Sequence, residues 1–217
     1  MKTDEEMIAE LTEPDAVRPV RIRAGESLLV RLLVLLSVPV WGAVFGIAVL
    51  LRLGRGKRPV LVFHERVGHG RKRLWVPKIA TSAVATNERR FAGLIEVATG
   101  GPVQLDVPDG FEQWLRHCGF DELPQLSLIL RGEMRLVGPR PVTPTELAEM
   151  AATGNEVGVD TLQPGLVGLW QVLDRHRYEL DERRALDALM IDNWSRRLQL
   201  RIVAVAWRQA LSRLASR

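Results

Sequence analysis

The stretch Leu32–Leu51, LLVLLSVPVWGAVFGIAVLL, contains twenty consecutive residues without a charge. A straight α-helix of this length extends about 30 Å, which matches the hydrocarbon core of a bilayer. The stretch does not resemble a secretory signal peptide, because it begins beyond residue 30 and the extreme N-terminus is acidic rather than basic. A buried core helix is the alternative, although few soluble helices keep so long an uncharged run. The stretch therefore predicts a membrane segment.

Pro39 lies near the middle of this run, where the missing backbone donor is expected to bend a helix. Both flanks are basic, with Arg18, Arg21, Arg23 and Arg31 before the run and Arg52, Arg55, Lys57 and Arg58 after it. The positive-inside rule places both flanks on the cytoplasmic side, next to anionic lipids. We therefore expect a re-entrant, Pro-kinked helix over residues 28–53. A bitopic span is the alternative, but it satisfies the rule at only one flank.

The composition describes one domain of ordinary size attached to this segment. The chain has 217 residues, 47% hydrophobic and 26% charged, which excludes a disordered chain and a polytopic channel. Its single cysteine, Cys118, excludes a disulfide framework and a multi-cysteine zinc site. The net charge of +4 combines an acidic leader with a basic body, since residues 21–217 hold 28 basic and 20 acidic groups. We expect a flexible acidic leader over 1–27 and a globular domain over 54–217.

The remaining patterns predict an α+β fold that is mainly helical and contains a small β-hairpin. Short β-like stretches at 59–64 and 74–77 flank a basic, glycine-bearing turn, and 163–171 is a Pro/Gly turn segment. Helices are expected over 111–118, 121–131, 144–152 and 180–192, the third beginning with the capping box Thr143–Glu146. Residues 195–217 form a basic amphipathic helix, either interfacial or packed on the domain.

Asp121 and Glu122 open the sequence DELPQ, residues 121–125. By spacing alone, two acids at the start of a helix are most simply explained as capping groups. Their basic surroundings favour chemistry, because Arg116 lies five residues upstream and Arg140 lies in the rigid turn GPRP, residues 138–141. A carboxylate can act as a nucleophile, Mg²⁺ can neutralise a diphosphate, and arginine forks can hold its oxygens. The pattern therefore indicates phosphoryl transfer.

Other chemistries lack support in the sequence. There is no Walker loop, no Rossmann glycine fingerprint and no HExxH motif, and the four histidines do not have metal-ligand spacing. The basic balance alone would suit a nucleic-acid binder. Aromatic residues are not clustered with the basic ones as a stacking platform requires, so no nucleic-acid partner is expected.

The motifs DELPQ (121–125) and LVGPRP (136–141) resemble those of the bacterial sugar transferases, which are monotopic polyprenyl-phosphate phosphoglycosyl transferases. The resemblance covers about residues 28–211. Supporting matches occur at Pro59-Val60 with Arg66-Val67-Gly68, at Leu115-Arg116, at Pro164-Gly165 with Gly168, and at Gln171-Val172, Asp187 and Asn193-Trp194-Ser195.

The resemblance implies an enzyme on the cytoplasmic face of the bacterial inner membrane that begins exopolysaccharide, O-antigen or glycan assembly. The family's catalytic dyad falls on Asp121 and Glu122, which are also the expected Mg²⁺ ligands. The expected substrate-binding residues are Lys78, Arg116, Arg140 and Arg175. Asp121 would attack a UDP-sugar, release UMP and form an aspartyl phosphosugar intermediate, which undecaprenyl or another polyprenyl phosphate would then take up.

Three positions depart from the family pattern. Ala80 replaces the arginine of the family's KFR(T/S)M segment, Met190 replaces a tyrosine, and Gln199 replaces an aspartate. These changes leave the dyad intact. They also keep open an alternative, in which the chain is a catalytically weakened paralogue that acts as a membrane-anchored scaffold in glycan assembly. The sequence does not select one UDP-sugar.

Overall fold

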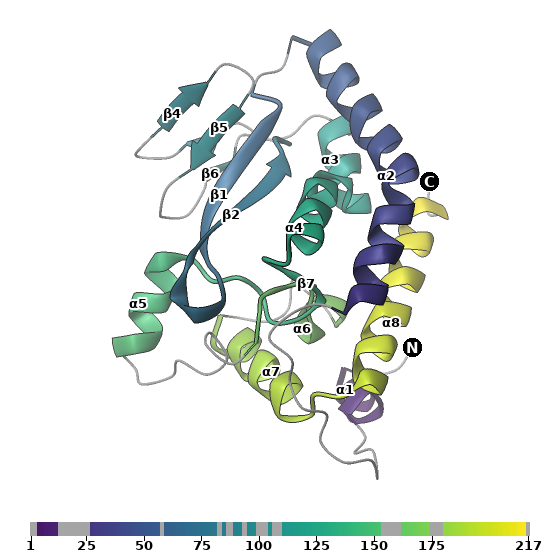
Figure 1. Cartoon of the computed structure of the whole chain (residues 1–217), viewed down its shortest axis with the longest axis vertical. Coiled ribbons are helices and arrows are strands. Elements are labelled where there is room, and N and C mark those ends of the chain that lie inside the picture. Colours follow the sequence, from purple (N-terminus) through teal and green to yellow (C-terminus); the bar gives the residue numbers. More distant parts are fainter. Residues whose placement is uncertain are drawn as a thin grey trace.

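The computed structural model describes residues 4–12, 27–56, 59–81, 84–85, 89–92, 95–98, 104–105, 110–152, 162–173 and 180–215. Helix α2 (Leu28–Gly54) runs along one side of the molecule beside α8 (Arg196–Ala215), and the strands β1 and β2 lie on the other side (Figure 1). Helices α3 (Gly110–Cys118) and α4 (Leu126–Arg131) lie between them. The dyad-bearing segment 120–125 connects these two helices and is therefore central in the fold.

Helix α2 is one continuous helix through Pro39. The Ser27 hydroxyl caps its first turn by accepting from the Val30 amide at 3.3 Å. Beside the proline, Ser37 Oγ donates to the Val34 carbonyl at 2.7 Å, and Trp41 Nε1 donates to the same oxygen at 3.5 Å. Pro39 thus removes one backbone donor from the helix but does not divide it into two arms, since the helix continues to Gly54.

Most of the α2 surface is exposed and apolar. Leu28, Leu36 and Val40 are 82%, 67% and 71% exposed, and only the inner face is buried. A core helix would be buried on most sides, so this alternative from the sequence is wrong. Within the described residues, α2 is the one helix long and apolar enough to cross a membrane.

The expected hairpin is confirmed. β1 (Leu61–Val67) and β2 (Arg73–Ile79) pair antiparallel, with Val62 opposite Lys78, and the short 3₁₀ turn η1 (His69–Arg71) connects them. β5 (Ile95–Ala98) adds in parallel to β1, and β4 (Arg89–Ala92) completes the order β2-β1-β5-β4. Strand content is therefore greater than one hairpin. Two further pairs join β3 (Val84–Ala85) to β6 (Gln104–Leu105) and β7 (Arg135–Val137) to β8 (Gly165–Val167).

Most of the expected helices are present, with two differences. α3, α5 (Pro144–Ala152), α7 (Leu180–Asp192) and α8 match the predicted segments. The predicted helix 121–131 is instead the 3₁₀ turn η2 (Phe120–Gln125) followed by α4, since Pro124 has no amide to donate. The predicted turn segment 163–171 contains β8 and the start of α6 (Leu169–Val172).

Part of the expected flexible leader is helical. α1 (Asp4–Thr12) contacts α8, and Leu11 is buried in the same apolar cluster as Leu198 and Ile202. Arg201 Nη1 also donates to the Leu11 carbonyl at 3.2 Å. The physical reason is that Met7, Ile8 and Leu11 lie on one face of a helix, which overrides the acidic composition.

Helix α2 also forms one wall of two apolar clusters that support the site. Val34 packs with Leu74, Leu128 and Met134, which joins α2 to β2 and α4. Ala48 packs with Ile79 and Leu115, which joins α2 to β2 and α3. Helix α2 and the globular domain therefore share a core.

Candidate active site

Asp121 is placed by a sharp change of chain direction between α3 and η2. Gly119 adopts the left-handed conformation with φ 74°, which glycine accommodates without a Cβ clash. Phe120 then anchors the turn, because its ring meets Trp114 edge to face at 5.3 Å. Asp121 follows directly and is 8% exposed. The local fold thus presents a largely desolvated carboxylate at a fixed point.

Glu122 is held from the hairpin by Lys78. Lys78 Nζ on β2 lies 2.7 Å from Glu122 Oε1, and about a third of each side chain is exposed. These two predicted site residues are 44 positions apart in the sequence and are brought together by the packing of β2 on η2. The structure therefore joins Asp121, Glu122 and Lys78 in one place.

The charge environment of Asp121 suits an activated nucleophile. Burial and, to a smaller extent, the neighbouring Glu122 charge raise its pKa from 3.8 to about 6, against the opposing charges of Lys78 and Arg116. Arg116 is exposed in the last turn of α3, and its charge acts on Asp121. At neutral pH the Asp121 carboxylate is ionised yet poorly hydrated, which favours attack on phosphorus.

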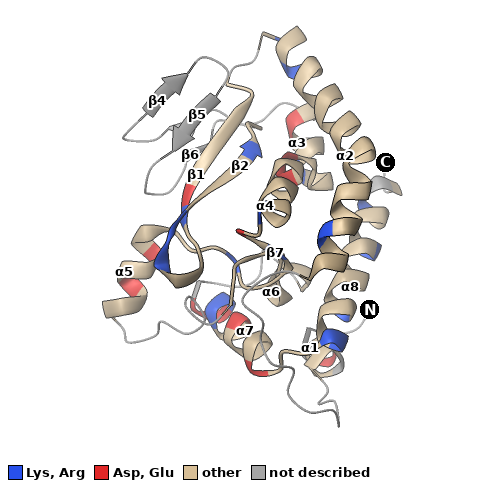
Figure 2. Cartoon of the chain, in the orientation of Figure 1, with Lys and Arg blue, Asp and Glu red and all other residues tan. Residues whose placement is uncertain are grey.

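Figure 2 shows basic positions at both ends of the β1–β2 hairpin, one of them at the end of β2 that lies beside α3 and α4. His64 lies on β1, on the same strand as Arg66 and opposite Val76. Burial, together with the charges of Arg66 and Lys78, lowers its pKa to about 3, so the imidazole is neutral. From the sequence we interpreted His64 as an isolated histidine. The approach of Lys78 becomes apparent only when β1 is paired with β2.

Arg140 is placed by close contact between two glycine backbones. Gly138 N donates to the Val167 carbonyl at 3.0 Å, and Gly165 N donates to the Pro139 carbonyl at 2.8 Å. A Cβ on Gly165 would overlap the Gly138 backbone, so no side chain fits there. The two motifs around Gly138 and Gly165 are thus two sides of one parallel pair, β7 and β8.

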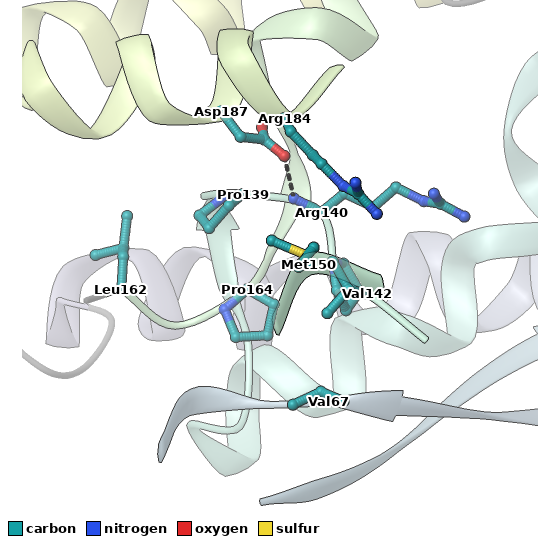
Figure 3. A pocket seen from close by; sticks show the side chains of 10 residues that line it. Val67, Pro139, Arg140, Val142, Met150, Leu162, Pro164, Arg184 and Asp187 are labelled. Atoms are coloured by element: carbon teal, nitrogen blue, oxygen red, sulfur yellow. Dashed lines mark hydrogen bonds between the residues drawn. The ribbon is translucent and has the colours of Figure 1, made fainter. Parts of the chain in front are cut away.

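A small pocket of about 40 Å³ lies beside Pro139 and Arg140, as Figure 3 shows. Asp187 from α7 borders it, and Asp187 Oδ2 accepts from the Arg140 amide at 3.3 Å. Burial raises the pKa of Asp187 to about 7, although the Arg140 amide and charge oppose this shift. Asp187 therefore helps to fix the loop that carries Arg140.

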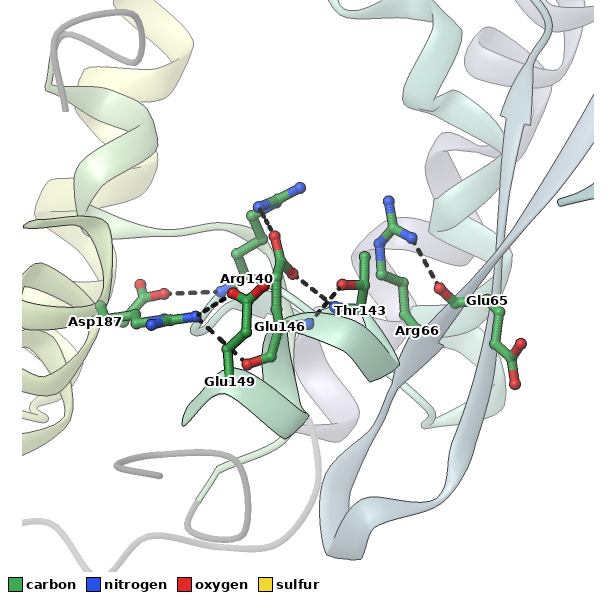
Figure 4. Close-up of polar contacts among 8 residues, drawn as sticks. Glu65, Arg66, Arg140, Thr143, Glu146, Glu149 and Asp187 are labelled. Carbon is green, nitrogen blue, oxygen red and sulfur yellow. Dashed lines mark hydrogen bonds and ion pairs between the residues drawn. The ribbon is translucent and has the colours of Figure 1, made fainter. Parts of the chain in front are cut away.

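Arg66 and Arg140 lie close together beside Glu146, as Figure 4 shows. Arg140 Nη1 is 3.4 Å from Glu146 Oε1, while Glu146 Oε2 accepts from the Thr143 amide at 2.6 Å. The Glu146 amide in turn donates to Thr143 Oγ1 at 3.0 Å, which confirms the predicted capping box. Arg66 was not among the predicted substrate-binding residues. The sequence feature that could have pointed to it was its place in the Arg66-Val67-Gly68 match to the family.

The carboxylates of Asp121 and Glu122 suit Mg²⁺ as an expected cofactor. Mg²⁺ commonly takes one or two protein carboxylates and completes its shell with water and substrate phosphates. Within the described part of the chain, no group of three or more His, Cys, Asp or Glu side chains could hold a metal. The dyad would therefore bind Mg²⁺ together with a diphosphate rather than alone. Arg175, the remaining predicted ligand, lies outside the described residues.

Comparison with known proteins finds similar bacterial proteins. The UDP-galactose-lipid carrier transferase of Erwinia amylovora is 34% identical over 144 residues, which cover 61% of this chain and 29% of that protein. The exopolysaccharide production protein ExoY of Sinorhizobium fredii is 45% identical over 89 residues, 41% of this chain and 38% of its own length. The undecaprenyl-phosphate galactose phosphotransferase of Salmonella typhimurium is 38% identical over 84 residues, 38% of this chain and 17% of its own.

These alignments thus cover less than half of each relative. A family model described as bacterial sugar transferase matches residues 21–213, from before α2 almost to the end of α8. The match includes the dyad, the Lys78 strand and the Arg140 loop. The chain therefore belongs to the bacterial sugar transferase family.

Proposed function

We propose that the chain is a membrane-associated phosphoglycosyl transferase that moves a sugar-1-phosphate from a UDP-sugar to a polyprenyl phosphate. The observation that carries this proposal is the buried Asp121 carboxylate, which lies beside Glu122 and Lys78 on a turn that contacts α2. The relatives' names support the substrate classes, since they include a lipid carrier transferase and an undecaprenyl-phosphate phosphotransferase. The product would enter exopolysaccharide or related glycan synthesis, as the name of ExoY suggests.

In the first step, an Asp121 carboxylate oxygen attacks the β-phosphorus of the donor. The bond from this phosphorus to the bridging oxygen breaks, and the bond's electron pair leaves with UMP. The product on the protein is an aspartyl phosphosugar. Bound Mg²⁺ would supply neutralising charge for the diphosphate, while Lys78 and Arg116 reduce the repulsion between the anionic nucleophile and the anionic substrate.

In the second step, a phosphate oxygen of the polyprenyl phosphate attacks the same phosphorus. The aspartyl oxygen leaves, the Asp121 carboxylate is restored, and the sugar is linked to the lipid through a diphosphate. This acceptor oxygen is already ionised, so the step needs no general base. The contact between η2 and α2 supports the proposal, because it holds the nucleophile next to the membrane segment where the lipid phosphate lies.

We further propose that α2 is re-entrant, with both flanks on the cytoplasmic side. The support is the basic sequence on both sides of an exposed apolar helix. Leu200 and Trp207 on α8 are also exposed, at 70% and 66%, and extend the apolar surface beyond α2. Arg196 and other basic residues of α8 suit anionic headgroups at the same interface.

The decisive experiment is an assay of UMP release from a panel of UDP-sugars, with purified protein in lipid nanodiscs, Mg²⁺ and polyprenyl phosphate. Asp121→Asn is expected to abolish release, because the neutral amide is a poor nucleophile. Asp192→Asn is the matched control, since Asp192 is exposed at the end of α7 and should leave release unchanged. Full activity of Asp121→Asn would overturn the assigned role.

The scaffold alternative draws on the departures from the family pattern. Ala80 is buried at the end of β2, so this position supplies no charge to the site, and Met190 is packed in the α6–α8 core. A scaffold predicts no transfer of label to the protein from a β-³²P-labelled UDP-sugar. It also predicts normal glycan assembly in cells that carry Asp121→Asn, which the transferase proposal excludes.

A further inference from the structure

We propose that the groove between α2 and α3 binds one phospholipid of the membrane, with an acyl chain inside the groove and the lipid phosphate on Arg55. The groove has a volume of about 240 Å³, and its α2 wall consists of Val44, Ile47, Ala48 and Leu51. The inference goes beyond the proposed function and does not depend on the transferase chemistry, because the bound lipid is neither donor nor acceptor.

The wall of the groove opposite α2 is aromatic. Trp114 on α3 lies between two phenylalanines, with its ring centroid 6.3 Å from that of Phe111 and 5.3 Å from that of Phe120. The described residues that line the groove are all aliphatic or aromatic, so the groove suits a hydrocarbon chain rather than a headgroup. Its volume is below the roughly 300–1,000 Å³ of a pocket for a whole ligand, so it fits one segment of a chain.

The groove runs along α2 and opens onto the exposed apolar surface of this helix. Positions 44, 48, 51 and 55 have the three- and four-residue spacing that places side chains on one stripe of a helix. From Val44 to Arg55 this stripe is about 16 Å long at 1.5 Å per residue. Ile47 and Leu51 line the groove and are also 58% and 41% exposed. In a bilayer, acyl chains that contact the outer surface of α2 can therefore enter the groove from the side.

A cation lies at one end of the groove. Arg55 directly follows α2, and its guanidinium carbon lies 4.6 Å from the centroid of the Phe111 ring. Arg55 Nη1 also donates to the Leu51 carbonyl at 3.1 Å, so two residues that line the groove hold Arg55 at its rim. Arg55 is exposed, and among the described residues no carboxylate forms an ion pair with it. An arginine in this position suits a lipid phosphate at the membrane surface.

The position of Arg55 favours a phospholipid over the polyprenyl acceptor. Phe111, which Arg55 contacts, lies at the start of α3, whereas Phe120 and Asp121 follow the end of this helix. The nine residues of α3 extend about 13 Å. A phosphate on Arg55 is thus at the opposite end of α3 from Asp121, where the acceptor phosphate has to react. Phospholipids also make up most of a bilayer, so mass action favours them in a groove that opens to its interior.

The bound chain would complete the packing beside the turn that carries Asp121. Figure 1 shows α3 beside α2, and Phe120, which lines the groove between them, directly precedes Asp121. Apolar cavities of this kind do not hold water, so without a chain the Phe120 ring lacks contacts on one side. The lipid would therefore stabilise the folded chain at this turn, and the melting temperature should depend on phospholipid.

The experiment titrates the full chain, freed of lipid in detergent, with dioleoyl phosphatidylglycerol and measures binding by native mass spectrometry. The wild type is expected to bind one lipid. Val44→Phe should weaken this binding about tenfold or more, because the added ring fills the groove. Val40→Phe is the matched control and should leave binding unchanged, since Val40 is 71% exposed on the outer surface of α2. Arg55→Gln should weaken binding about fivefold, as expected for one cation at a membrane surface, whereas Arg131→Gln should not.

Further variants and a competitor keep the outcome decisive. If Val44→Phe does not fold, Ile47→Phe narrows the mouth of the groove from an exposed position and should also weaken binding. Phosphatidylglycerol should raise the melting temperature of the wild type more than that of either variant. Equal binding by the wild type and the groove variants overturns the proposal, and so does an equal loss in Val40→Phe. Displacement of the phospholipid by an equimolar amount of farnesyl phosphate would assign the groove to the acceptor chain and overturn it as well.

Discussion

At the residue scale, Asp187 shows how a buried carboxyl makes stability depend on pH. Its folded pKa of about 7 lies above the ordinary 3.8, so the folded state binds a proton more tightly than the unfolded state. The unfolding free energy contributed by this group therefore falls as pH rises from about 4 to about 7 and stays low above that. Burial destabilises the ionised Asp187 carboxylate, but this carboxylate accepts a hydrogen bond from the Arg140 amide and so fixes the loop that carries Arg140.

Asp187→Asn is expected to stabilise the protein by about 1–3 kcal/mol at pH 8 and by a smaller amount at pH 5, where only part of the loss has occurred. Asparagine cannot ionise, but its carbonyl oxygen can still accept from the Arg140 amide. Thermal unfolding at both pH values in one detergent measures the effect, with the exposed Asp192→Asn as control. A larger loss of stability at pH 8 than at pH 5 would contradict this account.

The chemistry of individual residues was also the feature of the site that could best be predicted from the sequence. Asp121 and Glu122 are adjacent, so a local motif points to them, and Thr143 carries a local capping signal that the structure confirms. The contact of Lys78 with Glu122 depends on which strand packs against η2. Arg66 and His64 acquire their environment only from long-range pairing. A local pattern carries no information about those partners.

At the element scale, α2 and α3 are joined by a buried ion pair between Arg52 and Glu112. Their side chains are 4% and 5% exposed, the atoms Nη1 and Oε1 are 2.5 Å apart, and Arg52 Nη2 also donates to the Pro59 carbonyl at 3.1 Å. α3 leads directly into Gly119 and Asp121. The pair therefore connects α2 to the helix that precedes Asp121.

Glu112→Gln is expected to destabilise the protein by about 3–5 kcal/mol, because it leaves the Arg52 charge buried without its carboxylate. The double change Arg52→Met with Glu112→Leu should recover most of this loss, since no buried charge remains. Glu133→Gln, at the exposed pair with Arg131, should cost less than about 1 kcal/mol. Denaturant titrations of the four proteins test this, and equal losses for Glu112→Gln and Glu133→Gln would refute it.

At the scale of the whole molecule, the course of α2 decides how the chain sits in a membrane. A re-entrant helix places positions 20 and 57 on the same side, whereas a bitopic span separates them. In intact cells, single cysteines introduced at Val20 and Lys57, with Cys118→Ala, should both resist a membrane-impermeant thiol reagent. Labelling of one position alone would establish a bitopic span. Permeabilised cells, in which both positions should react, supply the control.

The overall architecture was only partly predictable. An uninterrupted run of apolar residues predicts α2, and capping residues at fixed spacings predict other helices. These patterns lie within short stretches of sequence, so the elements could be predicted from them. The parallel addition of β5 to β1, and of β8 to β7, joins segments far apart in the chain. The α1 helix is similar, because its burial depends on α8. Contacts between residues far apart in the chain decide such features, and no short stretch of sequence contains both partners of such a contact.

The shared core between α2 and the globular domain has a consequence for how such proteins can be recombined. Val34 and Ala48 supply inner walls to clusters that also contain Leu74, Leu128 and Leu115. A foreign anchor of equal hydrophobicity would present different shapes to these clusters and would lack the partner of Glu112. In chimeras, the anchor and the elements that surround the dyad must therefore be exchanged as one inherited unit.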